Sequence, residues 1–318
     1  MPGSTIQLMT EGQEMPDGRK RFKRFYICLA PLKNGFINGC RPLLGLDGCH
    51  LKGPYDGQLL AAVVTDANNG MYPLAWAVVE AENSKRNMWK DHKGIGIRML
   101  LWLAARATTD YTFNKHMEEM KKLSKKCFNW LSEKPRSQWS RSAFRPFCKS
   151  DMFVNNHSEV FNSSIRRYRD LPIISMFKFI HVDVMRRIQM RRDKMQNSYA
   201  LNPICPNAMG RLNKYILLTI NFIFKAIEQS RGYHVIWSGG ARYLVTMTSD
   251  GYEIFVDLDA HTCACKKWQL SGIPCYHACA CIAWSKKPFE PFIHQSYNKD
   301  MFLSCYQHIV EPIYGEEE

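Results

Sequence analysis

The sequence lacks an apolar run long enough to cross a membrane. Its most apolar stretch, Tyr215–Phe224, is too short and contains Asn221, whereas a transmembrane helix needs about 20 apolar residues. The first apolar stretch, Phe25–Leu32, is short and broken by Pro31, which argues against a secretory signal peptide. We therefore expect no association with a membrane.

Several common catalytic signatures are also missing. The sequence has no Gly-rich phosphate loop, no Ser–His–Asp order of a serine hydrolase, no Rossmann fingerprint, no internal repeat and no low-complexity tract. Hydrophobic residues make up 46% and charged residues 23% of the 318 residues. This ordinary composition excludes disorder as the main state, and the length predicts about two domains.

Acidic residues are few compared with basic ones. There are 43 Lys and Arg against 29 Asp and Glu, a net charge of +14, which favours a polyanionic partner without identifying it. A basic helix between Ser163 and Asn197 could track a phosphate backbone, although a solvated helix face has the same pattern. The candidate DNA-binding residues are Arg166, Arg167, Arg186, Arg187, Arg191 and Arg192.

Hydropathy predicts a mixture of strands and helices, that is, an α+β fold. Strands are expected at 42–50, 58–66 and 71–80, joined as an antiparallel meander with an Asn-Asn-Gly turn at 68–70. Helices are expected at 97–108, 111–131, 156–168, 173–196 and 208–229, followed by a second meander over 233–258.

Composition along the chain predicts five consecutive segments. We expect a poorly ordered leader over 1–36, a main domain over 37–200 and a helical connector over 201–232. A metal-binding region over 233–285 and a C-terminal tail over 286–318 would follow. The Asn-Pro-Ile-Cys-Pro-Asn sequence at 202–207 suggests a linker at the domain boundary.

The twelve cysteines are distributed unevenly. Seven stand singly along the chain, whereas five fall within Cys263–Cys281. Without a secretory signal, scattered single cysteines are typical of small buried residues in a reducing compartment, the cytosol or the nucleus. The dense group beside a histidine instead indicates metal chemistry.

The densest part of this group has the spacing Cys263-x-Cys265-x9-Cys275-x-His277. A Gly-Ile-Pro turn at 272–274 can bring the second pair to the strand end that carries the first. Three thiolates and one imidazole then complete a closed tetrahedral site, as in structural zinc centres. Cys279 could replace His277 as the fourth ligand, although Cys279 also suits the buried face of a helix.

Two carboxylates form a second candidate site. Asp47 ends an apolar strand, and Glu159 lies near the start of a predicted helix. Such a pair could share Mg²⁺ ions that clamp the two oxygens of a phosphoryl transfer. Equally, Asp47 could be a turn residue and Glu159 a capping or solvated side chain.

The cysteine pattern carries a family resemblance. Cys-x-Cys and Cys-x-His, separated by a spacer that contains Trp268 and Gly-Ile-Pro, resemble the SWIM zinc finger over residues 240–285. SWIM fingers are associated with DNA or protein binding. The resemblance implies that the zinc ligands are Cys263, Cys265, Cys275 and His277.

The segments around the two carboxylates carry a second family resemblance. Pro42–Gly53, Gly57–Asn83 and Trp139–Ile165 resemble the plant Mutator-like (MULE) transposases, within a likeness that covers about residues 36–315. That family has an RNase H-like core with a DDE metal triad, usually followed by a SWIM finger. The resemblance implies that Asp47 is the first catalytic Asp and Glu159 the catalytic Glu.

The sequence departs from this family between the two carboxylates. Ala81–Trp89 runs almost directly into Lys93–Thr109, so that the segment with the second catalytic Asp is missing. Asp66, Asp91 and Asp110 remain, and none has the matching context. The deletion would also remove the strand beside the one that bears Asp47, and would leave an open sheet edge.

Together these features predict a truncated RNase H-like core with a helical insertion, then a small β-meander and a SWIM zinc finger. The predicted protein is nuclear, transposon-derived, bound to structural Zn²⁺ and DNA, and catalytically inactive. One alternative is an active DDE transposase that uses Mg²⁺. Another is an adaptor whose zinc finger binds a protein partner.

Overall fold

The computed structural model describes residues 2–12, 20–53, 57–80, 94–150, 155–198, 202–229, 233–247 and 252–313. The chain divides into two compact units, each built from segments far apart in the sequence. Unit 1 comprises Met1–Asn83, Met152–Met209 and Gln295–Glu318, and unit 2 comprises Ser84–Asp151 and Gly210–His294. Within the described residues, none of the helices has the length and apolar character that a membrane span requires.

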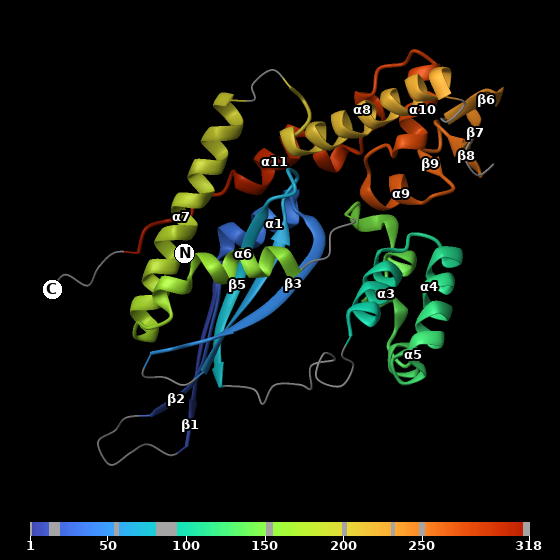
Figure 1. Cartoon of the computed structure of the whole chain (residues 1–318). Helices are drawn as coiled ribbons and strands as arrows, with labels where there is room; N and C mark the ends of the chain where they lie inside the picture. The colour runs from blue at the N-terminus through green and yellow to red at the C-terminus, as the bar shows by residue number, and fades with distance from the viewer. Residues whose placement is uncertain are drawn as a thin grey trace. The chain divides into compact units, whose positions relative to one another are not determined.

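Unit 1 is built on a five-stranded antiparallel sheet with the order β1-β2-β5-β4-β3 (Figure 1). Its strands are β1 (Thr5–Glu11), β2 (Arg21–Cys28), β3 (Arg41–His50), β4 (Gly57–Thr65) and β5 (Met71–Glu80). The predicted meander of β3, β4 and β5 is confirmed almost residue for residue. In the predicted turn, Asn69 has a φ of 59°, a left-handed conformation that asparagine tolerates.

The expected poorly ordered leader is corrected by β1 and β2. These strands pair with each other, and β2 also pairs with β5 through Phe25 to Val78 and Ile27 to Trp76. Phe25 and Ile27 alternate along β2 and pack against the core, which places this strand in the sheet. The segment therefore forms part of the sheet, with β2 partly buried and β1 exposed along most of its length.

Helices cover the sheet of unit 1. They are α1 (Ala30–Gly39), α6 (Asn155–Ser164), α7 (Ile173–Ser198) and α11 (Lys299–Tyr306). Helix α6 contacts β3, β4 and β5, while α1 packs against α11 (Figure 1). The buried residues include Leu32, Leu59, Trp76 and Ile180.

The expected C-terminal tail contributes to this core. Phe302, Cys305 and Tyr306 of α11 are all buried. The expected linker at 202–207 is also packed, because Ile204 forms a β-bridge with Asn298 and the Cys205 amide donates to the Tyr297 carbonyl at 2.8 Å. The five consecutive segments predicted from the sequence therefore do not coincide with the two compact units, each of which combines distant parts of the chain.

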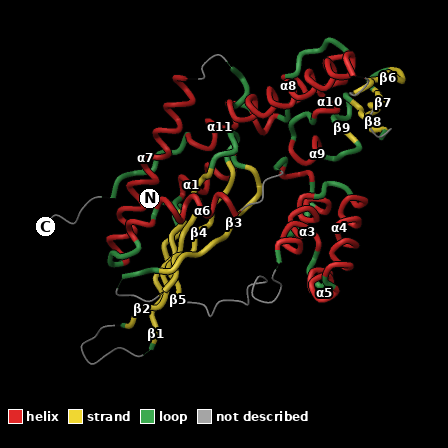
Figure 2. The backbone as a smooth tube through the Cα atoms, viewed as in Figure 1, coloured by secondary structure: helices red, strands yellow, loops and turns green. Residues whose placement is uncertain are grey.

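Unit 2 contains a helical part and a sheet part (Figure 2). The helical part is α3 (Ile95–Arg106), α4 (Asp110–Leu123) and α5 (Lys125–Ser132). The sheet part has four antiparallel strands in sequence order: β6 (Tyr233–Gly239), β7 (Arg242–Met247), β8 (Glu253–Asp257) and β9 (Thr262–Cys263). Two short helices follow, α9 (Lys267–Ser271) and α10 (Tyr276–Trp284).

The remaining elements are one long helix and several single turns. Helix α8 (Pro206–Gln229) begins in unit 1 and continues in unit 2. The 3₁₀ turns are η1 (Arg136–Gln138), η2 (Arg141–Ala143), η3 (Pro146–Cys148), η4 (Arg166–Tyr168), η5 (Glu290–Phe292) and η6 (Gln295–Tyr297). Two antiparallel sheets with helices confirm the predicted α+β class.

Candidate metal centre

The first two cysteines of the cluster lie on the turn that follows β9. Cys263 ends this strand and Cys265 lies two residues later. The Lys266 amide donates to the Cys263 carbonyl at 2.8 Å, and Lys266 adopts a φ of 57°. This tight turn brings both sulfur atoms to the same side of the chain.

The other two ligands lie at the start of α10. Cys275 is the N-cap residue of this helix, and His277 belongs to its first turn. Gly272 ends α9 with a φ of 73°, a conformation that glycine adopts without steric cost. The Gly-Ile-Pro turn therefore reverses the chain between α9 and α10, as the sequence predicts, and returns it to Cys263.

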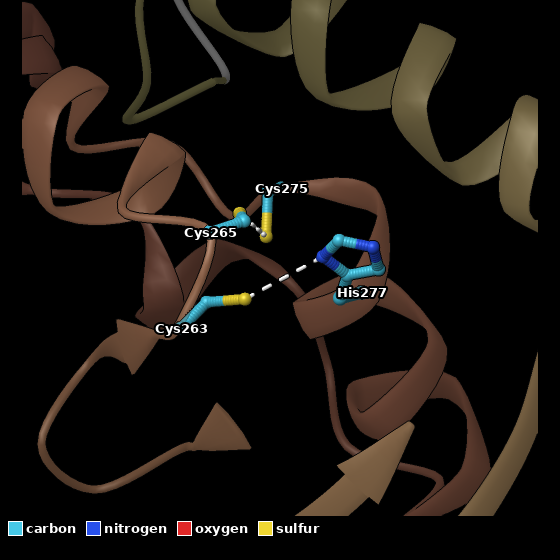
Figure 3. Close-up of side chains that lie close together, drawn as sticks. All are labelled: Cys263, Cys265, Cys275 and His277. Atoms are coloured by element: carbon cyan, nitrogen blue, oxygen red, sulfur yellow. Dashed lines mark hydrogen bonds between the residues drawn. The ribbon is translucent and has the colours of Figure 1, made fainter. Parts of the chain in front are cut away.

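The four side chains converge on one point (Figure 3). Their ligand atoms all lie within 4.8 Å of one another. The Cys265 and Cys275 sulfur atoms are 3.6 Å apart, and the Cys263 sulfur lies 3.5 Å from Nδ1 of His277. Within the described parts of the chain, no other group of three or more Cys, His, Asp or Glu side chains is close enough to share an ion.

These distances fit a tetrahedral zinc ion. Zn–S bonds of about 2.3 Å and Zn–N bonds of about 2.0 Å at tetrahedral angles separate two sulfur atoms by about 3.8 Å and sulfur from nitrogen by about 3.5 Å. The two observed separations agree with these values to within a few tenths of an ångström. A set of three thiolates and one imidazole leaves no open coordination position, so the centre is suited to holding structure rather than to catalysis.

The surroundings of the cluster favour metal-binding chemistry. Cys263, Cys275 and His277 are buried. Hydrogen bonds with the thiols of Cys263 and Cys275 lower the pKa of the Cys265 thiol, whereas the hydrogen bond with Cys265 raises the pKa of Cys263 and burial raises that of Cys275. A thiolate, the form that binds zinc, is therefore favoured at Cys265.

The neighbouring cysteines of α10 have a different environment. Burial raises the pKa of the Cys279 thiol to about 12, and burial followed by repulsion from Cys279 raises that of Cys281 to about 12. The Cys279 sulfur faces the Pro274 carbonyl oxygen at 3.7 Å. Cys279 is not part of the cluster, so the structure favours His277 as the fourth ligand.

The comparisons with known proteins point to the same residues. The family model of the SWIM zinc finger matches residues 243–282. The match spans β7, β8 and β9, the connecting turn, α9 and most of α10, and it includes all four clustered side chains. No curated protein and no solved structure matches the chain. The SWIM match and the geometry together support zinc as the metal of this centre.

Two residues of the spacer support the SWIM turn: Gln269, which the sequence argument passed over, and Trp268, which it used only for the family resemblance. The Gln269 side chain accepts from the Cys263 amide at 3.2 Å and donates to the Cys263 carbonyl at 3.0 Å. Trp268 is buried, stacks on His261 and donates to the Phe292 carbonyl at 3.2 Å. Their place between the two ligand pairs was the available signal, because a short spacer must fix both ends of the turn.

The predicted catalytic carboxylates are placed on neighbouring elements of unit 1. Asp47 is half-buried on β3, and Glu159 is exposed on α6. The direct partner of Asp47 is Asn162, whose amide Nδ2 donates to its carboxylate at 2.9 Å. Among the described residues no third carboxylate joins them in a metal-sized group, so we derive no catalytic step through Mg²⁺.

The three substitutes for the missing Asp have other surroundings. Asp66 is fully buried and accepts hydrogen bonds from the Asn68 and Gly70 amides, the Tyr306 hydroxyl and Arg191. Asp110 is exposed and pairs with Arg136. Asp91 and the junction near Lys90–Lys93 lie outside the described residues.

The six candidate DNA-binding arginines differ in their environments. Arg191 binds the buried Asp66, and Arg192 donates to the Tyr306 carbonyl at 2.6 Å, so both guanidinium groups have partners within unit 1. Arg167 pairs with Asp183 at 2.9 Å. Within the described residues Arg166, Arg186 and Arg187 have no carboxylate in ion-pair distance, and these three are available to an anionic partner.

Proposed function

We propose that this protein is a zinc-stabilised, DNA-binding nuclear protein related to the Mutator-like transposases and catalytically inactive. The observation that carries the proposal is the cluster of Cys263, Cys265, Cys275 and His277 within the SWIM match. A closed centre of this kind stabilises a small binding module. Zinc would be held by these four residues and would supply no reaction chemistry.

Charge supports nucleic acid as the partner. The chain carries a net charge of +14. The three arginines without a carboxylate partner are gathered in unit 1, on η4 and α7. Guanidinium groups with no internal partner can replace the counterions of a phosphate backbone, which is the main source of sequence-independent DNA affinity.

The proposed lack of catalysis is supported by the carboxylate geometry. The Asp47 carboxylate accepts a hydrogen bond from the side-chain amide of Asn162, which holds it within unit 1. Glu159 is exposed, and no described carboxylate completes a triad with these two. A two-metal mechanism needs a fixed ligand set around both ions.

The test of DNA binding is gel retardation of duplex DNA by the zinc-loaded full chain at increasing salt. We expect the logarithm of affinity to fall linearly with the logarithm of salt concentration, and an Arg166→Gln, Arg186→Gln double variant to lower the slope by up to about 2. The matched control is Lys122→Gln, an exposed charge on α4 of unit 2. A duplex that is not retarded at low salt contradicts the proposal.

The same preparation tests the lack of catalysis. Incubation with DNA and Mg²⁺ or Mn²⁺ should give no cleavage or strand transfer. Cleavage that is lost in Glu159→Ala would instead support an active DDE transposase.

A second candidate function is that of an adaptor that binds another protein. The observation in its favour is an aromatic pair on unit 2, formed by Trp237 and Trp284. Their rings lie 6.5 Å apart, and the two residues are 54% and 52% exposed. Exposed tryptophans of this kind are typical interface anchors. An adaptor would capture its partner without DNA and would lose it in Trp237→Ala and Trp284→Ala variants that still bind zinc.

A further inference from the structure

A cavity of unit 1 is lined by three arginines, of which Arg191 is paired with the buried Asp66. It has a volume of about 410 Å³, and its lining residues come mainly from β5, α6 and α7. Arg186, Arg187 and Arg191 all line it. The volume lies within the usual range for small-molecule sites, about 300–1,000 Å³.

The nearby acidic groups are already engaged. Asp183 lines the cavity, but it accepts from Arg167 at 2.9 Å and from the Tyr168 hydroxyl at 2.8 Å. Asp66 is fully buried and receives Arg191 at 3.1 Å together with the Tyr306 hydroxyl at 2.8 Å. Asp66 and Asp183 also attract the Arg187 guanidinium, but neither carboxylate forms an ion pair with it among the described residues.

Arg187 is the least compensated of the three. Its one hydrogen-bond contact is Nη1 to the Met71 sulfur at 4.0 Å, a weak acceptor. Burial, and then repulsion from Arg191, lowers its pKa. Arg186 is exposed and has no polar partner among the described residues. Arg187 is half-buried and has no carboxylate in ion-pair distance among the described residues, so the arrangement favours an external anion.

Apart from Ser164, the remaining walls are apolar. They are formed by Pro73, Phe161, Ile165, Ile180, Val184 and Met190. Guanidinium groups bind phosphate oxygens in pairs with well-defined geometry. A ligand that suits both parts of the cavity combines a phosphate with an apolar or aromatic body.

We propose that this cavity binds a phosphate ester, with Arg186 and Arg187 as the principal phosphate ligands and the apolar walls covering the ester group. The phosphate could belong to a mononucleotide-like molecule or to a nucleic-acid backbone. In the second case the inference deepens the proposed DNA binding and rests on it. In the first case it stands independently of DNA.

The test measures binding of AMP and of adenosine to the zinc-loaded full chain by isothermal titration calorimetry. We expect saturable binding of AMP at one site and at least tenfold weaker binding of adenosine. Arg187→Gln and Arg186→Gln should each weaken AMP binding about 10- to 100-fold, the range for one lost charge-assisted contact. The control Lys194→Gln removes an exposed charge from α7 outside the cavity and should bind within twofold of the wild type.

A stability measurement separates a ligand role from a structural one. Because Arg187 has no ion-pair partner among the described residues, Arg187→Met should unfold at the same or a higher temperature than the wild type while it loses AMP binding. Absence of saturable AMP binding, or wild-type affinity in both glutamine variants, would overturn the proposal. Lower thermal stability of Arg187→Met with unchanged AMP affinity would also overturn it.

Competition identifies the source of the phosphate. A blunt duplex oligonucleotide without terminal phosphates should displace AMP if the site takes backbone phosphates. AMP that stays bound in the presence of this duplex supports a phosphomonoester ligand. A chain that binds AMP through Arg187 but does not retard DNA would leave this site standing while the proposed DNA binding fails.

Discussion

Cysteines a few residues apart in this protein differ in chemistry because their sulfur atoms have different neighbours. Cys275 meets two thiols and an imidazole, whereas Cys279, one helical turn later, faces a backbone carbonyl. The first environment can share a metal charge among four ligands. The second favours a neutral thiol that packs as a small apolar group.

This difference predicts opposite results for two substitutions. Cys275→Ser should abolish stoichiometric zinc binding, measured by atomic absorption of the purified chain. Structural zinc contributes about 10–16 kcal/mol in isolated fingers, as much as the whole stability of a typical domain, about 5–15 kcal/mol. The finger should therefore unfold, seen as lost hydrogen-exchange protection in β8 and α10.

The control for this prediction is Cys279→Ala. This variant should keep one zinc per chain. Its stability should fall only slightly, because the substitution removes no more than the buried volume of one sulfur atom. If Cys279→Ala lost zinc while Cys275→Ser retained it, the assignment of Cys275 as a zinc ligand would be wrong.

His157 on α6 predicts a pH dependence of unit 1. This histidine is buried, its Nε2 has no hydrogen-bond partner among the described residues, and burial lowers its pKa. As the pH falls, the unfolded chain takes up the proton first, at about pH 6.5. The contribution of neutral His157 to the free energy of unfolding is therefore complete above that pH. It is lost as the pH falls from there toward the lower pKa of the folded state.

The measurement is chemical denaturation between pH 7.5 and pH 5. Each unit of pKa depression corresponds to about 1.4 kcal/mol of stability. His157→Gln should flatten the dependence, whereas the exposed His50→Gln should preserve it. A wild-type slope in His157→Gln would show that other groups set the acid sensitivity.

At the scale of elements, periodicity predicts which segments are strands or helices better than where they end. The predicted helix over 111–131 is divided at Ser124 into α4 and α5. The Ser124 hydroxyl accepts from the Cys127 amide at 3.2 Å and starts a new helix. Likewise Thr109, and not Asp110, caps α4. Such side-chain hydrogen bonds to the backbone do not change the spacing of hydrophobic residues. Hydrophobic periodicity therefore cannot predict where they end or start a helix.

For the candidate sites too, the sequence predicts local features better than contacts between distant segments. The zinc ligands follow from spacing because all four lie within one continuous segment. The partners of Asp47 and of the arginines do not follow, because they depend on contacts between distant segments, such as Asp47 with Asn162 and Asp66 with Arg191.

The expected open edge of β3 agrees with the structure, in which this strand pairs only with β4 among the described residues.

The packing of α1 against α11 gives a prediction at this scale. A Cβ atom at Gly35 would overlap the Cys305 carbonyl oxygen and the Tyr72 hydroxyl. Backbone cannot move aside as a flexible side chain can, so Gly35→Ala should destabilise unit 1 by about 1–3 kcal/mol or more. Thermal unfolding of the full chain, with and without the substitution, measures this effect.

The matched control is Gly210→Ala in α8. No atom outside its own helix lies within 4 Å of a Cβ built there. Since alanine favours the helical backbone, this change should be neutral or stabilise by about 0.5–1 kcal/mol. Equal destabilisation by both substitutions would point to a general effect of helix glycines instead of close packing at α1.

At the scale of the whole molecule, stability is divided between two separate kinds of core. Unit 1 buries aliphatic and aromatic residues of its sheet and helices without any cluster of metal ligands among its described residues. In unit 2, Cys263 and Cys275 are themselves members of the core beside Val245, Val256 and Trp268. The sequence could not reveal this division, because each unit is discontinuous along the chain.

Removal of zinc should therefore unfold one part of the molecule selectively. Treatment with a strong chelator should abolish hydrogen-exchange protection in β7, β8 and α10, because folding of this small core is coupled to metal binding. Protection in β3, β4, β5 and α7 should persist, since their core needs no metal. Added Zn²⁺ should restore the protection of the finger, while Mg²⁺, which prefers oxygen ligands, should not. Simultaneous loss of protection in both units would mean that the sheet of unit 1 depends on the zinc finger for its stability, contrary to the independent cores described above.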